Sequence, residues 1–207
     1  MTRIGTVFLV DDDQALCAAT TRLLDAHGFK VRSFTSAENF LSRFDPKEPG
    51  CLLLDLRMPG RSGLELQQAL AEQGVEIPIV FLTGHADVPT SVYAMKRGAV
   101  DFLQKPASEE DLIAALERAL VRDAEQRKSH AELSVLEARY ATLTPREREV
   151  LVEIVAGQRN KQAAHSLGIA ERTVKLHRSR VLEKMGADSL ADLVRMAEHL
   201  GLGPDDQ

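Results

Sequence analysis

The feature of this sequence that most restricts its fold is an alternation of short apolar runs with segments of helical spacing, over about the first 120 residues. Two of the runs, CLLLD and IPIVFLT, are apolar almost throughout, which is typical of strands buried on both faces. Strands that alternate with helices form a parallel sheet covered on both sides. Strands are predicted at Thr6–Val10, Lys30–Phe34, Cys51–Asp55, Ile79–Thr83 and Asp101–Gln104. Apolar residues recur at helical spacing between them, in residues 15–24, 64–70 and 92–95.

Charged and polar residues gather at the carboxyl ends of the predicted strands. Three aspartates follow the first strand, the third strand ends in another, the fourth ends in a threonine, and a lysine follows the fifth. Ligands of open parallel sheets bind beyond the carboxyl ends of the strands. The side chains expected to converge there are Asp11, Asp12, Asp55, Thr83 and Lys105. Asp13 is expected to cap the first helix instead, because aspartate is a favourable N-cap.

Such a cluster suits phosphoryl chemistry. Carboxylates that lie close together repel each other, and a hard cation such as Mg²⁺, which prefers oxygen ligands, relieves the repulsion. An aspartate can attack phosphorus and form an acyl phosphate when positive charge neutralises the phosphoryl oxygens. Mg²⁺ and Lys105 would supply that charge, and Thr83 a hydrogen bond.

Four runs together resemble the receiver domain of two-component response regulators, over about residues 5–122: VFLVDDD, CLLLDLRMPGRSGLEL, IPIVFLTGHADV and GAVDFLQKP. The resemblance implies an α/β fold, a five-stranded parallel doubly wound sheet of the flavodoxin or CheY type with strand order 2-1-3-4-5. It implies that Asp55 is the phosphoacceptor in an acidic pocket with Asp11 and Asp12. Thr83 and Lys105 would sense the phosphate.

The same resemblance implies a bound Mg²⁺ or Mn²⁺ ion. Its ligands would be Asp12, Asp55 and the backbone carbonyl of Arg57, with Asp11 acting through water. Phe102 falls on the switch position of the family. Because Phe102 has no hydroxyl group, it can report phosphorylation only through a change in its burial. The alternative is that Phe102 is an ordinary core residue with no switch role. Arg57 and His85, near the mouth of the pocket, either tune the lifetime of the phosphate or are solvated loop residues.

Residues 108–140 contain no Pro or Gly and are rich in Ala, Glu, Arg and Leu. Ser108 and Asp111 resemble a capping box, so a helix is predicted to begin there. The predicted organisation is a receiver domain over residues 1–122, a helical linker over 123–140 and a DNA-binding domain over 141–207. Fewer than three clean heptads are present, so a solvated linker and a coiled-coil dimer both remain open.

The last part of the chain predicts an all-α domain of four helices. Thr144, Pro145 and Glu147 form a strong helix-start pattern. Helices are predicted at Pro145–Ala156, Asn160–Leu167 and Glu171–Met185, with a fourth capped by Asp188 and Ser189. On the third helix, Val174, Val181 and Met185 must face the core, so Arg172, Lys175, Leu176 and Ser179 face outward. Two short helices joined at a glycine, with a basic outer face, are typical of a helix-turn-helix that enters a major groove.

The charge distribution agrees with a polyanion partner for this domain alone. The whole chain has a net charge of −5, yet seven basic and two acidic residues lie between Arg159 and Lys184. A local basic patch on an acidic protein favours nucleic acid as the partner of that patch.

The stretch LTPREREVLVEIVAGQRNKQAAHSLGIAERTVKLHRSRVLEKM resembles the LuxR-type helix-turn-helix, over about residues 141–200. The whole chain therefore resembles the NarL/FixJ class of response regulators, and FixJ-like regulators most. The resemblance implies that Lys175, Leu176 and Ser179 approach base edges. The implied phosphate contacts are Asn160, Lys161, Thr173, His177, Arg178 and Arg180. A packing role for His177 is an equal alternative.

The function implied is that of a DNA-binding transcriptional regulator. A sensor histidine kinase would phosphorylate Asp55, which would promote homodimerisation through the fourth helix, fifth strand and fifth helix, and then binding to double-stranded promoter DNA. The resemblance also allows RNA polymerase as a partner. The chain is not expected to be an enzyme beyond slow loss of its own phosphate. No membrane segment is expected, and Cys17 and Cys51 fit the reducing cytoplasm.

Three other functions compete with this one. A regulator that ignores phosphorylation would use the receiver only as a scaffold, but it would not need the acidic pair, Thr83 and Lys105. A phosphatase of the haloacid-dehalogenase type needs a DxDx[TV] loop, and VDDDQA lacks that spacing. An RNA-binding output would need aromatic side chains for base stacking, and the chain has no Trp and two Tyr.

Overall fold

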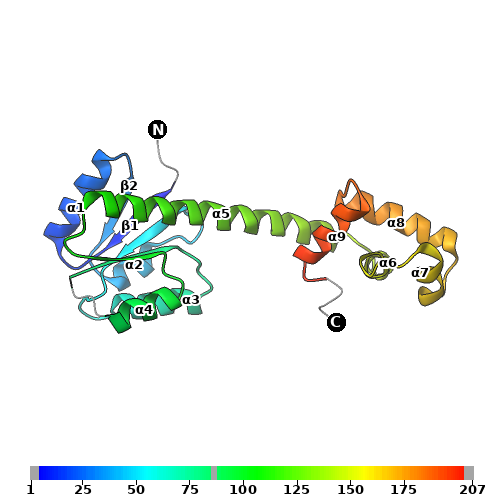
Figure 1. Ribbon diagram of the computed structural model, residues 1–207, viewed down its shortest axis with the longest axis horizontal. Helices are drawn as coiled ribbons and strands as arrows, with labels where there is room; N and C mark the ends of the chain where they lie inside the picture. Colours follow the sequence, from blue (N-terminus) through cyan, green and yellow to red (C-terminus); the bar gives the residue numbers. More distant parts are fainter. Residues whose placement is uncertain (1–4, 85–87, 203–207) are drawn as a thin grey trace. The chain divides into compact units, whose positions relative to one another are not determined.

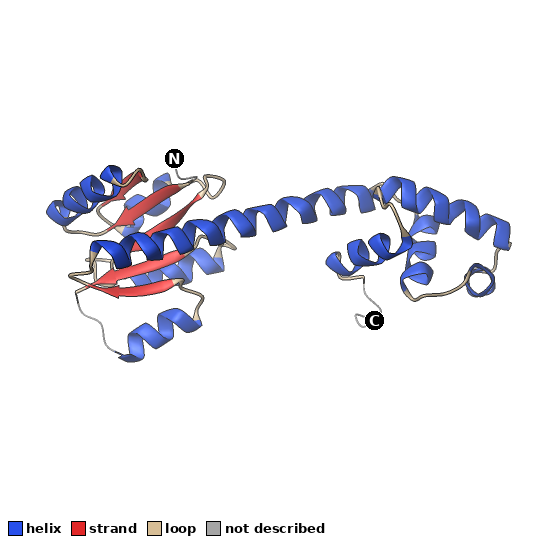
Figure 2. Cartoon of the chain, turned by 45° about the horizontal axis from the view of Figure 1, so that its top comes forward, coloured by secondary structure: helices blue, strands red, loops and turns tan. Residues whose placement is uncertain are grey.

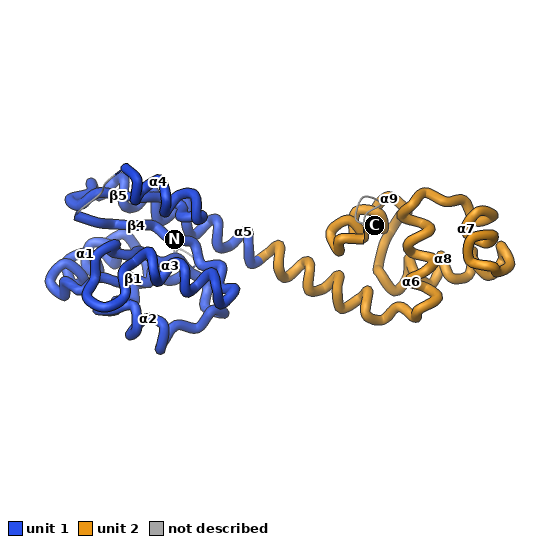
Figure 3. Tube along the Cα trace, turned by 90° about the horizontal axis from the view of Figure 1, so that it is seen from below, with its two compact units in different colours: residues 1–127 blue, residues 128–207 orange. Residues whose placement is uncertain are grey.

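A five-stranded parallel sheet forms the centre of the first of two compact units, residues 1–127 and 128–207 (Figure 3). The structure is a computed structural model that describes residues 5–84 and 88–202. The sheet order is β2-β1-β3-β4-β5, as predicted, and Figure 1 shows its neighbouring strands β1 and β2. Its strands are β1 (Thr6–Val10), β2 (Lys30–Phe34), β3 (Gly50–Leu54), β4 (Ile79–Thr83) and β5 (Asp101–Gln104).

Four strands have the predicted bounds, and the prediction for β3 was wrong by one residue. The strand begins at Gly50 and ends at Leu54, so Asp55 is the first residue after it. The amide of Asp55 still donates to the carbonyl of Val10 at 2.9 Å. Its side chain, however, accepts a hydrogen bond from the turn that follows. Asp55 is therefore attached to the sheet and already faces the loop.

Alternate strand residues enter two separate cores, as Figure 2 shows by the helices on either side of the strands. One face, with Phe8, Leu52 and Phe81, packs against α2 (Ala37–Arg43), α3 (Gly63–Glu72) and α4 (Val88–Lys96). The other face, with Val7, Leu53 and Val80, packs against α1 (Gln14–Ala26) and the first part of α5 (Glu109–Ala141). Because side chains alternate along a strand, apolar residues at every position produce this doubly wound arrangement.

Helix α4 has an exposed apolar surface. Its residue Ala94 is fully buried, but Val92, Tyr93 and Met95 are each nearly half exposed and Val88 is 76% exposed. The helical spacing at residues 92–95 therefore predicted the helix but did not mark an inward face.

Helix α5 is continuous from the first unit into the second. The amide of Asp111 donates to Ser108 Oγ at 3.1 Å, as in the predicted capping box, and the Ser108 hydroxyl donates to Asp111 Oδ2 at 2.6 Å. The predicted receiver boundary at residue 122 and the predicted linker both fall inside this helix. No helix in the part of the chain that the structure describes has the length and apolar character needed to cross a membrane.

The second unit contains the four predicted helices: α6 (Pro145–Val155), α7 (Asn160–Leu167), α8 (Glu171–Met185) and α9 (Leu190–His199). α6 ends one residue before the prediction because Ala156 is its C-cap. Helices α7 and α8 both end at glycines in the left-handed conformation, Gly168 and Gly186. Val174, Val181 and Met185 are fully buried, as predicted.

Glu147 is a buried carboxylate that holds α6 to α8. Its side chain caps the helix by accepting from the amide of Thr144 at 2.9 Å, and it pairs with Lys184 Nζ at 2.6 Å. The hydrogen bond from Lys184, with that from the Thr144 amide, lowers the pKa of Glu147 from 4.5 to about 2. A carboxyl whose pKa is lowered on folding stabilises the fold at pH values above its pKa in the unfolded chain. This contribution is lost as the pH falls through its pKa in the folded chain.

We therefore expect Glu147→Gln to lower the free energy of unfolding by about 3 kcal/mol at pH 6. The deficit should shrink by more than half at pH 3, where the unfolded carboxyl is protonated. Urea unfolding followed by far-ultraviolet circular dichroism measures both. Glu149→Gln, in an exposed pair with Arg146, is the matched control and should cost less than about 1 kcal/mol. A deficit for Glu147→Gln that is equal at the two pH values would contradict the assigned ionisation.

Candidate functional site

Two buried carboxylates lie at the carboxyl edge of the sheet. Asp11 follows β1 and is 3% exposed, and Asp55 follows β3 and is 6% exposed. The Asp11 amide donates to the carbonyl of Phe34 on β2 at 3.1 Å, as the Asp55 amide does to the carbonyl of Val10 on β1. The backbone of each acid is therefore fixed to the neighbouring strand. Because β1 and β3 are adjacent and parallel, the two acids face each other across one strand spacing.

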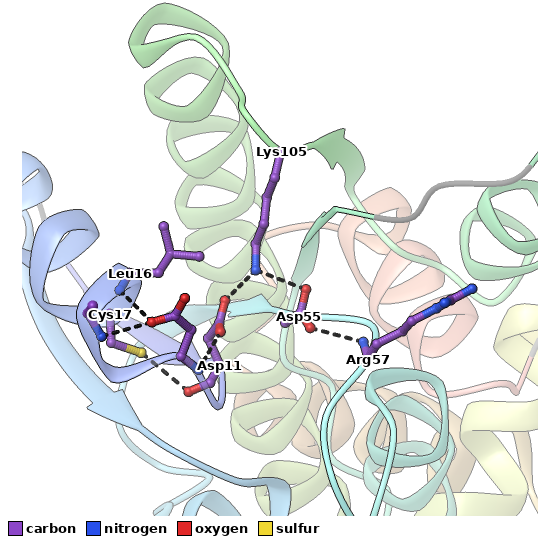
Figure 4. A network of polar contacts seen from close by, with 8 residues as sticks. Asp11, Leu16, Cys17, Asp55, Arg57 and Lys105 are labelled. Carbon is purple, nitrogen blue, oxygen red and sulfur yellow. Dashed lines mark hydrogen bonds and ion pairs between the residues drawn. The ribbon is translucent and has the colours of Figure 1, made fainter.

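Lys105 joins the two acids. Its Nζ lies 2.6 Å from Asp11 Oδ2 and 3.1 Å from Asp55 Oδ1 (Figure 4). The backbone amide of Lys105 donates to the carbonyl of Thr83 at 2.8 Å, so the lysine is positioned by the end of β4. The peptide bond from Lys105 to Pro106 is cis. The structure thus brings together Asp11, Asp55, Thr83 and Lys105, and Thr83 is 1% exposed.

Burial and charge act in opposite directions on these groups. Burial is the largest influence on Asp55 and raises its pKa; the hydrogen bond and charge of Lys105 oppose it, and Asp11 adds repulsion. Burial by itself would lower the pKa of Lys105, but hydrogen bonds to Asp11 and Asp55 outweigh it and the pKa is raised. The lysine is therefore held in its charged form between two carboxylates.

The remaining carboxylate oxygens have defined partners. Asp55 Oδ2 accepts from the amide of Arg57 at 3.0 Å, and Asp11 Oδ1 accepts from the amide of Asp13 at 2.9 Å. Asp13 caps α1 as predicted, accepting from the amides of Ala15 and Leu16. Asp12 is exposed beside them.

The oxygen donors suit a hard divalent cation. Among residues 5–84 and 88–202 no three His, Cys, Asp or Glu side chains are grouped closely enough to hold a metal by themselves. Mg²⁺ does not require such a cage, because it is usually bound by one or two carboxylates and keeps several waters. Two carboxylates and a backbone carbonyl at this edge therefore fit the ion.

The other predicted pocket residues that the structure describes are Phe102 and Arg57. Phe102, on β5, is half-buried and its ring centroid is 5.8 Å from that of Phe81, so it packs on the core. The side chain of Arg57 is exposed. His85 lies outside the described residues.

Two residues of the site were not predicted from the sequence. Gly63 begins α3, and a Cβ atom there would lie 2.3 Å from the carbonyl oxygen of Asp55. Its amide donates to the carbonyl of Leu56 at 2.9 Å, which closes the loop after Asp55. The available signal was a glycine directly after Ser62, the N-cap of α3. The Cys17 thiol lies 3.4 Å from the carbonyl of Asp11, and burial raises its pKa to about 11, so it stays a neutral thiol.

A second candidate site lies on α7 and α8. The three residues predicted to approach base edges are all exposed, with Leu176 at 50%: Lys175, Leu176 and Ser179. Lys175 Nζ lies 3.3 Å from Glu171 one turn earlier. Of the predicted phosphate contacts, Lys161 and Arg180 are exposed and the other four are half-buried: Asn160, Thr173, His177 and Arg178.

His177 and Arg178 contact protein groups as well as solvent. Nδ1 of His177 is buried without a hydrogen-bond partner among the described residues, which agrees with the packing alternative for this side chain. Arg178 Nη1 lies 3.5 Å from the carbonyl of Gln158. These two side chains are less exposed than those of Lys175 and Arg180.

Comparison with known proteins gives one family model for each unit. The response regulator receiver domain matches residues 7–117, and the luxR family of bacterial regulatory proteins matches residues 141–197. The response regulator protein TmoT of Ectopseudomonas mendocina is 44% identical over 95% of this chain and 89% of its own length. The transcriptional regulatory protein FixJ of Azorhizobium caulinodans is 44% identical over 97% of this chain and 95% of its own.

Solved structures agree with this result. The response regulator StyR is 46% identical and superposes with a TM-score of 0.82 over 93% of this chain and 98% of its own. Full-length FixJ from B. japonicum is 41% identical, with a TM-score of 0.59 over 98% and 99% of the two chains.

The tight packing of Gly63 gives a test of the site geometry. We expect Gly63→Ala to lower the free energy of unfolding by about 1–3 kcal/mol, because the new methyl group must displace the backbone that carries Asp55. Chemical denaturation measures this loss. Gly84→Ala, at the end of β4 with no atom within 4 Å of the added methyl, is the control and should cause no loss. If the two variants were equally stable, the loop after Asp55 would have more room than the structure gives it.

Proposed function

Because the chain belongs to the response regulators that combine a receiver domain with a LuxR-family DNA-binding domain, we propose that phosphorylation of Asp55 by a sensor histidine kinase controls its binding to promoter DNA. The observation that carries the proposal is the contact of one ammonium group with two buried carboxylates at the carboxyl edge of the sheet. We assign the receiver to residues 1–122, the linker to 123–140 and the DNA-binding domain to 141–207.

Asp55 is the nucleophile. A carboxylate oxygen of Asp55 attacks the phosphorus of a phosphohistidine, the P–N bond breaks, and the imidazole leaves with the electron pair of that bond. Lys105 neutralises charge on the transferred group, since its Nζ already lies 3.1 Å from Asp55 Oδ1. The hydroxyl of Thr83, at the end of the adjacent strand, donates a hydrogen bond to a phosphoryl oxygen.

A divalent cation completes the charge balance. Mg²⁺ or Mn²⁺ would be held by Asp12, Asp55 and the carbonyl of Arg57, with Asp11 acting through water. When bound, the ion supplies positive charge to the phosphoryl oxygens. Asp12 is exposed at the pocket edge, so its carboxylate can reach a hydrated ion. The chain is otherwise no enzyme, and hydrolysis of its own acyl phosphate returns it to the starting state.

The phosphate acts by shifting a population between two states. A phosphoryl group on Asp55 draws Thr83 toward it, and Phe102, half-buried against Phe81, repacks on the neighbouring strand. The surface of α4, β5 and α5 then forms a homodimer. The exposed apolar residues of α4 support this choice of surface, because large side chains such as Tyr93 and Met95 are each nearly half exposed there.

The output is recognition of double-stranded promoter DNA by α8. Lys175, Leu176 and Ser179 approach base edges in the major groove. Backbone phosphates are contacted by Asn160, Lys161, Thr173, His177, Arg178 and Arg180. The protein acts in the cytoplasm, where its DNA lies, and RNA polymerase is a further partner at the promoter.

Phosphorylation and its consequence can be tested together. Incubation with Mg²⁺ and acetyl phosphate should give the wild-type chain an acid-stable, base-labile phosphate, which Asp55→Asn lacks. Asp25→Asn, which changes an exposed aspartate on α1, is the control and should be labelled normally. The phosphorylated chain should elute as a dimer in size-exclusion chromatography and enrich a two-fold-symmetric site from random duplexes. If Asp55→Asn enriches the same site equally well, the receiver is a scaffold and the proposed switch is wrong.

The DNA contacts are tested on the selected site. Lys175→Ala should weaken binding by about 1–3 kcal/mol and relax the preference for one base pair, because it removes a base contact. Arg180→Ala should weaken specific and nonspecific binding alike. It should also reduce the slope of log affinity against log salt concentration by about 1, the share of one phosphate contact. Fluorescence anisotropy at several salt concentrations separates the two effects. Lys128→Ala, on the exposed linker, is the charge-matched control; a loss of affinity equal to that of Lys175→Ala would remove Lys175 from base reading.

A further inference from the structure

Arg127 lies on the part of α5 that follows residue 117, which we call the extension of α5. Its side chain binds a loop at the opposite end of the sheet from the acidic pocket. Its Nε lies 2.9 Å from Asp123 Oδ2 one turn earlier. Its Nη1 donates to the carbonyl of Lys47 at 3.0 Å, and its Nη2 donates to the carbonyls of Pro46 at 3.1 Å and Glu48 at 2.8 Å. One guanidinium therefore binds a carboxylate and three carbonyls, which occupies four of its five N–H donors.

Asp123 connects the same arginine to the sheet. It is 4% exposed, and its Oδ2 accepts from the amide of Gly50, the first residue of β3, at 2.9 Å. Gly50 has no room for a side chain, because a Cβ atom there would lie 2.0 Å from the carbonyl oxygen of Thr6. We call Asp123 and Arg127 the helix clasp.

The loop that the clasp grips is itself fixed. The amide of Thr6 donates to the carbonyl of Pro49 at 2.8 Å. Glu48 accepts from Thr6 Oγ1 at 2.9 Å and from Arg32 Nη1 at 2.5 Å, which ties the loop to β1 and β2. Partial burial of Glu48 opposes its ionisation, but hydrogen bonds from Thr6 and Lys30 and the charge of Arg32 outweigh it and lower the pKa of Glu48. The clasp is thus anchored on a charged network, not on a free loop.

The position of the clasp suggests its role. The receiver family model ends at residue 117, so both clasp residues lie beyond it. From Val121 to Arg127, Asp123 is the one buried residue, and a short helix without tertiary contacts is marginal in water. The first compact unit ends at Arg127, and α5 continues to Ala141 (Figure 3).

We propose that Asp123 and Arg127 are positioning residues that fix the extension of α5 to the receiver, so that the state of the acidic pocket is passed to the DNA-binding unit through this helix. The inference rests on the proposed function, because it concerns how that switch is transmitted. Neither residue takes part in phosphorylation or touches DNA. The clasp residues should therefore affect the coupling between the two sites and leave each site intact.

The experiment compares four full-length chains: wild type, Arg127→Ala, Arg127→Lys and the control Lys128→Ala. Lys128 is the next residue on α5 and makes only an exposed pair with Glu132 at 3.9 Å. For each chain, labelling by acetyl phosphate with Mg²⁺ and DNA affinity before and after labelling are measured. Exchange of the Gly50 amide proton is followed by nuclear magnetic resonance, because that proton is held by Asp123.

We expect phosphorylation to raise the DNA affinity of wild type and Lys128→Ala by a factor within the usual range of coupling between sites, about 5–150-fold. Both Arg127 variants should be labelled normally and exchange the Gly50 proton faster. Their gain in affinity should fall to less than about twofold, because a lysine cannot reproduce the planar contacts of arginine. A fifth chain, Asp123→Asn, keeps an acceptor for Gly50 but loses the charge, and it should give an intermediate gain. Normal labelling of each variant shows that its receiver remains folded.

The outcomes separate the two ideas. If wild type gains no affinity on phosphorylation, the proposed switch fails and the clasp has nothing to transmit. If wild type gains affinity and Arg127→Ala gains as much, only the clasp inference is overturned. A loss of labelling in Arg127→Ala would also overturn it, since the residue would then act on the pocket itself.

Discussion

The structure of the first unit depends on the ammonium of Lys105 lying between two buried carboxylates. Asp11 and Asp55 are placed side by side because β1 and β3 are neighbouring parallel strands, and without a cation their repulsion would oppose the same packing that brings them together. Removing one partner of a buried ion pair typically costs about 3–5 kcal/mol, because a charge is left uncompensated. The pocket is therefore stable only while it holds positive charge.

Most of the fold could be predicted from the sequence because its patterns are local. The apolar runs of β1, β3 and β4 indicated buried parallel strands, and the capping residues Ser108 and Thr144 marked the first turns of α5 and α6. The errors are equally physical. β3 ends at Leu54, and the side chain of Asp55 bonds the following turn. The apolar spacing of residues 92–95 predicted α4 but not which of its residues face inward, because Val92 and Met95 are each nearly half exposed.

The acidic pocket could be predicted for a different reason, since the topology of a parallel sheet brings the ends of its strands together whatever the intervening sequence. Asp11, Asp55, Thr83 and Lys105 were located on that basis. Gly63 was missed because its importance comes from a close approach to the Asp55 carbonyl, which no sequence pattern records. Arg127 was missed because its partners at residues 46–48 are about 80 positions away, and a charged residue in a polar helical stretch looks solvated.

The continuity of α5 restricts how this architecture can vary in evolution. Each residue added to an α-helix advances the chain by about 1.5 Å and turns everything after it by about 100°. One inserted residue between Arg127 and Ala141 would change the azimuth of the following unit far more than its separation. Insertions or deletions of about seven residues, close to two complete turns, would nearly preserve the rotational phase. Helical linkers of this type should therefore differ in length by multiples of about seven residues.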